Sequence, residues 1–330
     1  MTTNIDKALA CDYSIDIFNT STVQCLFNID GYPSSDLLDL LIAMRLLSST
    51  SDGTLSLTEF FGDKIPKYAI LSHTWGADSE EVTFKDIIDG LGKDKAGYSK
   101  IQFCGELAKR NGLQYFWVDT CCIDKSSGPE LSEAINSMFR WYHNATACYV
   151  YLLDVSVPNS EEDENYGSLF EAAFKKSRWF TRGWTLQELI APRLVEFFAV
   201  NRKRLGDKKS LERMIGEITG IDAQALRGND LSDFTIAERI SWAAKRETKR
   251  EEDKAYALLG ILDITMSLRY GEGRENALAR VQRKAEKSQN IGGEDGFPET
   301  SQECIFLLPG ALNLMLIETG LHGLMSGWKS

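Results

Sequence analysis

Four short apolar segments alternate with amphipathic segments between Tyr68 and Val200, and this alternation constrains the fold more than any other feature. The apolar segments are YAILS, YFWVD, ACYVYLLDV and LVEFFAV, at residues 68–72, 115–119, 147–155 and 194–200. The stretches between them, 98–112, 130–144 and 168–180, carry apolar residues at helical spacing. Apolar strands that alternate with amphipathic helices predict an α/β domain with a parallel sheet covered on both faces.

The segments outside this region have a different character. A helix is predicted at residues 36–47, and a polar break follows at 48–54. After Val200 we expect an all-α segment, with helices at residues 209–221, 235–262 and 275–288. From about residue 289 the chain is rich in glycine and then weakly apolar.

Charge and composition restrict the partners of the chain. The 330 residues carry a formal net charge of -11, which argues against non-specific binding to nucleic acid or anionic membranes, since both need a positive field. The basic run at residues 201–209 is expected to be a solvated loop. We see no secretory signal, and no window approaches the roughly 18 apolar residues of a membrane span. The seven irregularly spaced cysteines favour reduced thiols and a cytoplasmic location.

Polar side chains follow the predicted strands at the points where the strands end. Ser72, His73 and Trp75 follow the first strand, and Asp119 and Asp124 follow the second. Ligands of open α/β sheets gather outside the carboxyl ends of the strands, so we expect these residues in one cleft. His73 could carry a proton, orient a ligand or play a structural role. The two aspartates could hold ribose hydroxyls or cap turns.

The segment SRWFTRGWTLQEL, at residues 177–189, places a carboxylate among aromatic and basic residues. Trp184 and Glu188 are i and i+4 and share one helical face, Arg182 lies just upstream, and Pro192 ends the helix. Two interpretations are open. Glu188 is either a solvated residue on an amphipathic helix, or a carboxylate in an aromatic-walled cleft that also contains the strand-end residues.

Two further motifs favour simple interpretations. Cys121 and Cys122 are adjacent and lack a CxxC or HxxxH pattern, so no metal is expected. A thiol nucleophile would need a base such as His73. The preferred role of the two cysteines is to fill space at the end of the strand. A metal hydrolase built from His73, Asp119 and these cysteines is the least favoured alternative. The sequence YGEGRENA, at residues 270–277, could hold a phosphate at a helix N-terminus, but a plain turn is preferred.

Ordered blocks of this sequence resemble the fungal heterokaryon incompatibility (HET) domain. These blocks are YAILSHTWG, EVTFKDI, GYSKIQFCGELAKRNGLQYFWVDTCCIDK, ELSEAINSMFRWYHNATACYVYLLDV and SRWFTRGWTLQELIAPRLVEFFA. The resemblance assigns residues 44–200 to the HET domain and 201–288 to the helical segment that commonly follows it. Residues 1–43 form an N-terminal extension and 289–330 a divergent tail, and both could be lineage additions or artefacts of gene structure.

The resemblance implies a role in fungal non-self recognition that ends in programmed cell death, with self-association or another incompatibility protein as partner. HET domains are remotely similar to TIR domains, a flavodoxin-like module that in some cases cleaves NAD with a glutamate near a tryptophan. By this resemblance Glu188 would be catalytic, and NAD would be a substrate rather than a cofactor. The substrate would be bound by Ser72, His73, Trp75, Asp119, Asp124, Arg182 and Trp184. The rival function is a non-enzymatic signalling or scaffold module.

Overall fold

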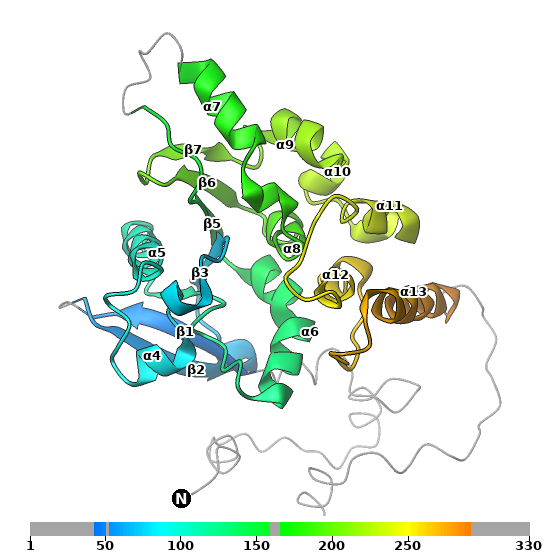
Figure 1. The fold of residues 1–330 in the computed structure, drawn as a ribbon, viewed down its shortest axis with the longest axis horizontal. Coiled ribbons are helices and arrows are strands. Elements are labelled where there is room, and N and C mark those ends of the chain that lie inside the picture. The colour runs from blue at the N-terminus through cyan, green and yellow to red at the C-terminus, as the bar shows by residue number, and fades with distance from the viewer. Residues whose placement is uncertain (1–42, 51–52, 159–165, 292–330) are drawn as a thin grey trace, which may run out of the picture. The chain divides into compact units, whose positions relative to one another are not determined.

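A seven-stranded mixed sheet forms the centre of the computed structural model, which describes residues 43–50, 53–158 and 166–291 (Figure 1). The strand order is β2-β1-β4-β3-β5-β6-β7. The bounds are β1 (Ala43–Ser49), β2 (Leu55–Phe61), β3 (Tyr68–His73), β4 (Tyr115–Trp117), β5 (Ala147–Leu152), β6 (Val195–Ala199) and β7 (Arg204–Asp207).

The four predicted strands are confirmed and form the parallel centre of the sheet. β3 pairs in parallel with both β4 and β5, and β5 pairs in parallel with β6. Counted along the chain, these four strands lie in the order 2-1-3-4, which is the flavodoxin-like order. Every residue of β3 and β5 is buried, as a sheet covered on both faces requires. The predicted α/β class is therefore confirmed, although antiparallel strands flank the parallel centre.

The prediction of a helix at residues 36–47 is wrong for residues 43–47, which the structure describes. Ala43–Ser49 is strand β1, whereas residues 36–42 lie outside the described residues. Met44 and Leu46 are buried while Arg45 between them is half-buried and faces Glu59 across the hairpin. The alternation covers only residues 43–46, since Leu47 is buried as well, and the leucine-rich run also fits a helical period.

The all-α expectation after Val200 is also wrong at its start. Arg204–Asp207 is strand β7, which pairs antiparallel with β6, so the basic run is largely a hairpin rather than a solvated loop. Arg204 Nε lies 2.7 Å from Glu196 Oε1 across this hairpin. Arg202, with a φ of 64°, takes the left-handed conformation in the turn.

The described part of the α/β region contains five α-helices, all but the first of which were predicted. They are α4 (Phe84–Ile88), α5 (Tyr98–Arg110), α6 (Gly128–Asn144), α7 (Tyr166–Lys175) and α8 (Thr185–Ile190). Gly112, with a φ of 73°, follows the end of α5 as a C-terminal glycine should. The helix predicted at 168–180 ends at Lys175, and a 3-10 turn, Arg178–Thr181, follows it.

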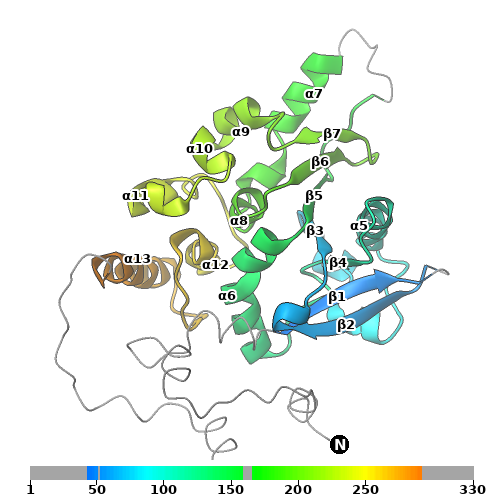
Figure 2. The ribbon, with the colours of Figure 1, turned by 180° about the vertical axis from the view of Figure 1, so that it is seen from behind.

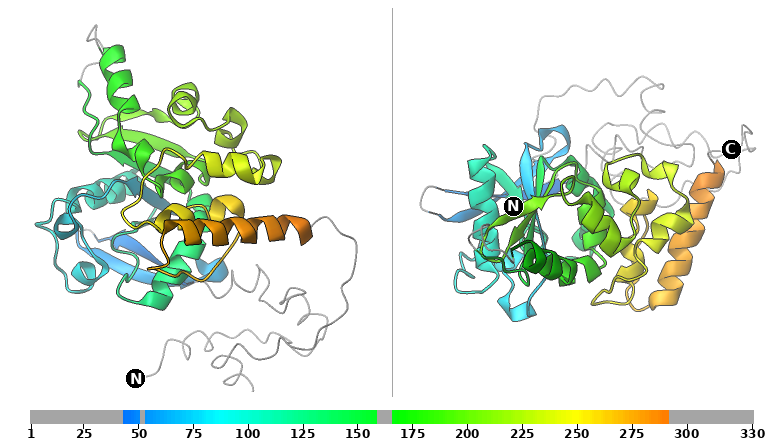
Figure 3. Two further views of the ribbon diagram at one scale, coloured as in Figure 1. Left: turned by 45° about the vertical axis from the view of Figure 1, so that its right-hand side comes forward. Right: turned by 90° about the horizontal axis from the view of Figure 1, so that it is seen from above.

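The C-terminal helices differ in length from those expected: the first is shorter than the predicted 209–221, and the last is longer than the predicted 275–288. They are α9 (Glu212–Thr219), α10 (Ala223–Leu226), α11 (Ile236–Ser241), α12 (Asp253–Tyr256) and α13 (Arg274–Ile291), so the single helix predicted at 235–262 is divided. Figures 2 and 3 show α5 on one face of the central strands and α6 with α8 on the other. Helices α9–α13 lie beyond α6 and α8. Within the described residues, no helix combines the length and the apolar character needed to cross a membrane.

Candidate functional site

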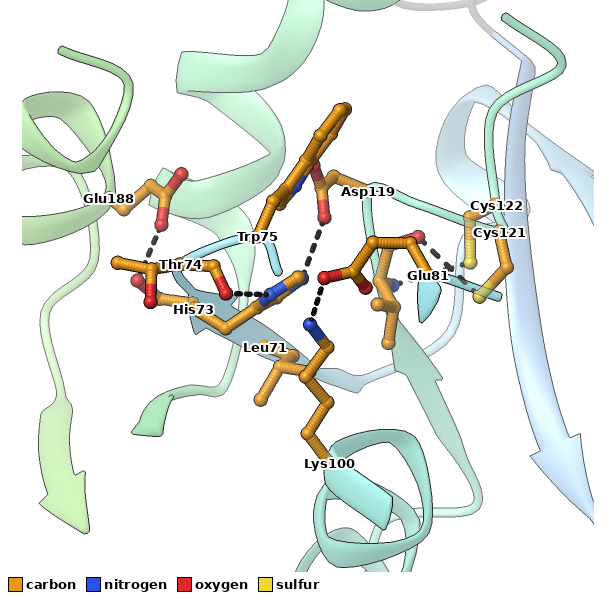
Figure 4. A network of polar contacts seen from close by, with 12 residues as sticks. Leu71, His73, Thr74, Trp75, Glu81, Lys100, Asp119, Cys121, Cys122 and Glu188 are labelled. Carbon is orange, nitrogen blue, oxygen red and sulfur yellow. Dashed lines mark hydrogen bonds and ion pairs between the residues drawn. The ribbon is translucent and has the colours of Figure 1, made fainter. Parts of the chain in front are cut away.

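The candidate site lies at the carboxyl ends of β3 and β4, next to helix α8 (Figure 4). Ser72 and His73 are the last residues of β3, and Asp119 follows β4. Glu188 lies in the last turn of α8, which precedes β6. The structure thus brings residues from three separate segments to one edge of the sheet, as the strand-end argument predicted.

Glu188 is held by a chain of buried hydrogen bonds. The Ser72 hydroxyl donates to Glu188 Oε2, and Trp179 Nε1 donates to Ser72 Oγ at 2.8 Å. The Tyr142 hydroxyl, which donates to the Leu71 carbonyl oxygen at 2.9 Å, is a further neighbour of the carboxyl group. Only 7% of the Glu188 surface is exposed, so the solvated-residue interpretation is wrong.

Burial raises the pKa of Glu188 to about 8. The hydrogen bond from Ser72 opposes this rise, the negative charge of Asp119 adds to it, and the positive charge of Arg246 opposes it. The carboxyl group is therefore mainly protonated at neutral pH. Ionisation would place a negative charge in buried surroundings.

A second cluster surrounds Asp119. His73 Nε2 lies 3.0 Å from Asp119 Oδ1, and Trp75 Nε1 donates to Asp119 Oδ2 at 2.9 Å. Lys125 Nζ lies 3.8 Å from the centroid of the Trp75 ring and 3.9 Å from Asp119 Oδ2. Although burial favours a higher value, Lys125 and the hydrogen bond with His73 hold the pKa of Asp119 well below its usual range. An ionised Asp119 thus orients His73 and Trp75, and 37% of the Trp75 surface remains exposed.

A buried ion pair supports the loop that carries Trp75. Lys100 Nζ donates to Glu81 Oε1 at 2.6 Å, and the Gly76 amide donates to the same oxygen at 2.7 Å. A Cβ on Gly97 would lie 2.7 Å from the Glu80 carbonyl oxygen, so the loop closes against a glycine. This pair could not be predicted from the sequence, because nothing in the helical pattern marks Lys100 as an inward-facing residue.

Three residues predicted for the site lie in other surroundings. The Asp124 carboxylate accepts from the Ser126 amide at 3.0 Å and so caps its own turn. Trp184 is a neighbour of Asp253. Burial raises the pKa of Asp253, and a hydrogen bond with Trp184 lowers it. Arg182 contributes its backbone carbonyl oxygen, which accepts a hydrogen bond from Arg246 Nη1 at 2.9 Å. The tryptophan connected to Glu188 is Trp179, through Ser72.

The structure also describes the surroundings of the cysteine pair and of the glycine turn. Cys121 and Cys122 are free and buried, and burial raises the pKa of Cys121 well above its ordinary value, which disfavours a thiolate. Among the described residues, no group of three His, Cys, Asp or Glu side chains could hold a metal ion. In the glycine turn, the amides of Gly271 and Gly273 both donate to Glu252 Oε1, at 2.8 and 3.1 Å. The chain's own carboxylate therefore occupies that turn.

The fold and the site define an α/β domain of flavodoxin-like strand order, with a polar network at its carboxyl edge and a helical region after it. Residues 68–165 match the family model described as "Heterokaryon incompatibility protein (HET)". The chain is also 54% identical over 254 residues to "Vegetative incompatibility protein HET-E-1" of Podospora anserina. The chain belongs to the fungal heterokaryon incompatibility family.

The second match covers 77% of this chain and 18% of the relative. The chain therefore spans about a fifth of the length of the curated relative that it matches. No solved structure matches the chain.

Proposed function

We propose that this chain is an effector of vegetative incompatibility, acting in fungal non-self recognition that ends in programmed cell death. The proposal rests on the identity of 54% to a protein named for vegetative incompatibility, over 77% of this chain. The partner would be a second copy of the chain or another incompatibility protein.

The proposed chemistry is hydrolysis of NAD at the nicotinamide glycosidic bond. One observation carries it: a buried carboxyl group, Glu188, is bonded to Ser72 at the end of β3, beside the point where the strand order reverses between β3 and β5. Ligands of open α/β sheets bind in the crevice at this point. An ionised Glu188 would hold the ribose hydroxyls and stabilise the oxocarbenium-like transition state. The exposed Trp75 ring offers a flat surface for a base or nicotinamide ring.

A non-enzymatic signalling module is the second candidate, and the same residue supports it. Glu188 is 7% exposed and mainly protonated at neutral pH, so it could simply tie α8 to the end of β3. A protonated carboxyl group can both donate and accept in such a network. Under this alternative, killing would follow from self-association or recruitment, and Glu188 would matter for stability alone.

Nicotinamide release from NAD by the purified chain, at high protein concentration, tests the enzymatic proposal. We expect Glu188→Gln to lower the rate by about two orders of magnitude or more, since electrostatic groups of this kind contribute about 3 to 4 kcal/mol. Glu286→Gln, on the exposed surface of α13, is the matched control and should change nothing. Full killing of fungal cells by a stable Glu188→Gln chain would contradict the enzymatic proposal and favour the scaffold.

A further inference from the structure

A short segment of the helical region is attached directly to the site helix. We call residues Arg246–Thr248 the strap. It lies between α11 and α12 and forms a parallel bridge with the residues just before α8. The Glu247 amide donates to the Thr181 carbonyl oxygen at 2.6 Å, and the Gly183 amide donates to the Glu247 carbonyl oxygen at 2.9 Å. The strap therefore fixes the chain where it enters the helix that carries Glu188.

The strap packs against Gly183 with almost no space between them. A Cβ added to Gly183 would lie 2.4 Å from Thr248 Cγ2, a distance that real Cβ atoms do not show. Gly183 has ordinary backbone angles, so the glycine is needed here for close approach rather than for a left-handed conformation. Such packing indicates a defined position of the strap rather than a loose contact.

Arg246 extends from the strap toward the site helix. Its side chain is buried, with 2% of the residue exposed, and Nη1 donates to the Arg182 carbonyl oxygen at 2.9 Å and to Thr185 Oγ1 at 2.8 Å. Thr185 begins α8, one turn before Glu188. Nη2 is also buried and has no hydrogen-bond partner among the described residues. Burial of a charged donor without a partner is unfavourable, so this nitrogen requires an explanation.

The same guanidinium group acts electrostatically on Glu188, whose ionised form it would stabilise. The groups around this carboxyl group are Ser72 from β3, Tyr142 from α6 and Asp119 after β4. Cys148 Sγ, from β5, lies 3.8 Å from the backbone carbonyl oxygen of Glu188. Of the charged neighbours Asp119 and Arg246, only Arg246 is positive. The effect is mutual, because burial lowers the pKa of Arg246 to about 10 and the negative charge of Glu188 opposes that fall.

We propose that Arg246 is a positioning residue of the Glu188 site, which fixes α8 through the strap and provides the positive charge that an ionised Glu188 requires. The helical region thus completes the site, well beyond residues 68–165 that match the family model. This role of Arg246 in catalysis rests on the proposed enzymatic function. The ionisation of Glu188 can be measured without any activity.

The test follows the carboxyl carbon of Glu188 by NMR as a function of pH, in the full chain with labelled glutamate. The signal is assigned by its loss in Glu188→Gln. Without the positive charge, Arg246→Gln should raise the titration midpoint of Glu188 by about 1 unit or more. Arg246→Lys, which keeps the charge, should bring the midpoint back toward that of the wild type.

Arg239→Gln is the matched control. Arg239 is also a buried arginine of the helical region, its Nη1 donates to the Ile261 carbonyl oxygen at 3.1 Å, and its Nε has no hydrogen-bond partner among the described residues. Its charged neighbours are Asp263 and Asp230 rather than Glu188. Arg239→Gln should therefore lower the melting temperature and leave the Glu188 midpoint unchanged.

Equal midpoints in the wild type and Arg246→Gln would overturn the inference, as would an equal shift in Arg239→Gln. If Arg246→Gln does not fold, Arg246→Met removes the same charge without burying a side-chain amide. A Glu188 midpoint equal to that of the wild type in this variant would also overturn the inference. Nicotinamide release is measured on the same samples. A shifted midpoint in a chain that never cleaves NAD would overturn the enzymatic proposal and leave the role of Arg246 intact.

Discussion

Glu188 is surrounded by groups from several parts of the chain that are distant from it in sequence. Ser72 and Tyr142 lie near its carboxyl group, Cys148 contacts its backbone oxygen, and Arg246 faces it from the helical region. A carboxyl group in such a setting has a different proton affinity in the folded and unfolded chain. Its protonation is therefore linked to both stability and activity.

The stability of the chain should fall as pH rises through neutrality. Glu188 has a folded-state pKa of about 8, above its unfolded value, so its contribution is fully present below about pH 4 and is lost as pH rises through 8. The free energy of unfolding by urea, measured from pH 5 to pH 9, should fall on the order of 4 kcal/mol more in the wild type than in Glu188→Gln. Asp119, whose pKa is lowered, titrates at more acidic pH and does not affect the stability between pH 5 and pH 9. Parallel curves for the two chains would show that Glu188 titrates normally.

The pH dependence of activity should have the opposite sign. If the ionised carboxylate stabilises positive charge on the ribose, the rate of nicotinamide release should rise with pH and level off above about 8, where Glu188 is ionised. Initial rates under saturating NAD, over a range in which the chain stays folded, provide the measurement. A rate that is flat or falls across this range would mean that the protonated form of Glu188 is sufficient.

At the scale of elements, the sequence predicted what depends on local pattern. The central strands and helices α5 and α6 follow from apolar periodicity, and Gly112 marks the end of α5. The divided helix at 235–262 could not be predicted in this way, because the residues around Glu247 leave the helical path to pair with Thr181 and Gly183. That pairing is a tertiary contact, and no proline in the segment signals the break.

The site shows the same division. Ser72, His73 and Asp119 could be selected because the carboxyl ends of parallel strands meet at one edge. Trp179 and Arg246 could not, since they reach the site from a 3-10 turn and from the strap. The i, i+4 spacing drew attention to Trp184 instead, but Trp184 is the N-cap residue of α8 and turns toward Asp253.

The close approach of the strap predicts a marked sensitivity at Gly183. Gly183→Ala should lower the free energy of unfolding by about 1 to 3 kcal/mol, because the new Cβ forces the strap away from α8. Gly128→Ala, at the start of α6 with nothing within 4 Å of its Cβ position, should be neutral or slightly stabilising. Urea unfolding of both variants measures the difference.

Thr248→Ser provides the complementary test, because it removes the methyl group that the new Cβ would meet and keeps the hydroxyl. The double variant Gly183→Ala/Thr248→Ser should recover most of the stability lost in Gly183→Ala. Failure of this rescue would show that the alanine acts through the backbone rather than through contact with the strap.

At the scale of the whole molecule, the helical region and the α/β domain share contacts along α6 as well. Asn136 and Met266 exchange two hydrogen bonds, from the Met266 amide to Asn136 Oδ1 at 2.8 Å and from Asn136 Nδ2 to the Met266 carbonyl oxygen at 3.1 Å. A Cβ on Gly260 would lie 2.0 Å from Phe139 Cβ, so the two parts are closely packed there. Strand β7, beyond residue 200, completes one edge of the sheet.

These contacts predict where the chain can be cut. A fragment of residues 44–287 keeps the described sheet almost entire, the strap and most of α13, so it should fold and retain any toxicity. A fragment of residues 44–200 loses β7 and the strap, and it exposes the surfaces of α6 and α8 that α10 and the turn at residues 260–262 contact. We expect that shorter fragment to be insoluble or to lack a cooperative thermal transition. Circular dichroism melting and a cell-death assay on both fragments test this. An unfolded 44–287 fragment would mean that residues outside it complete the core. A stable and toxic 44–200 fragment would make the helical region dispensable and would contradict the assignment of Arg246 to the site.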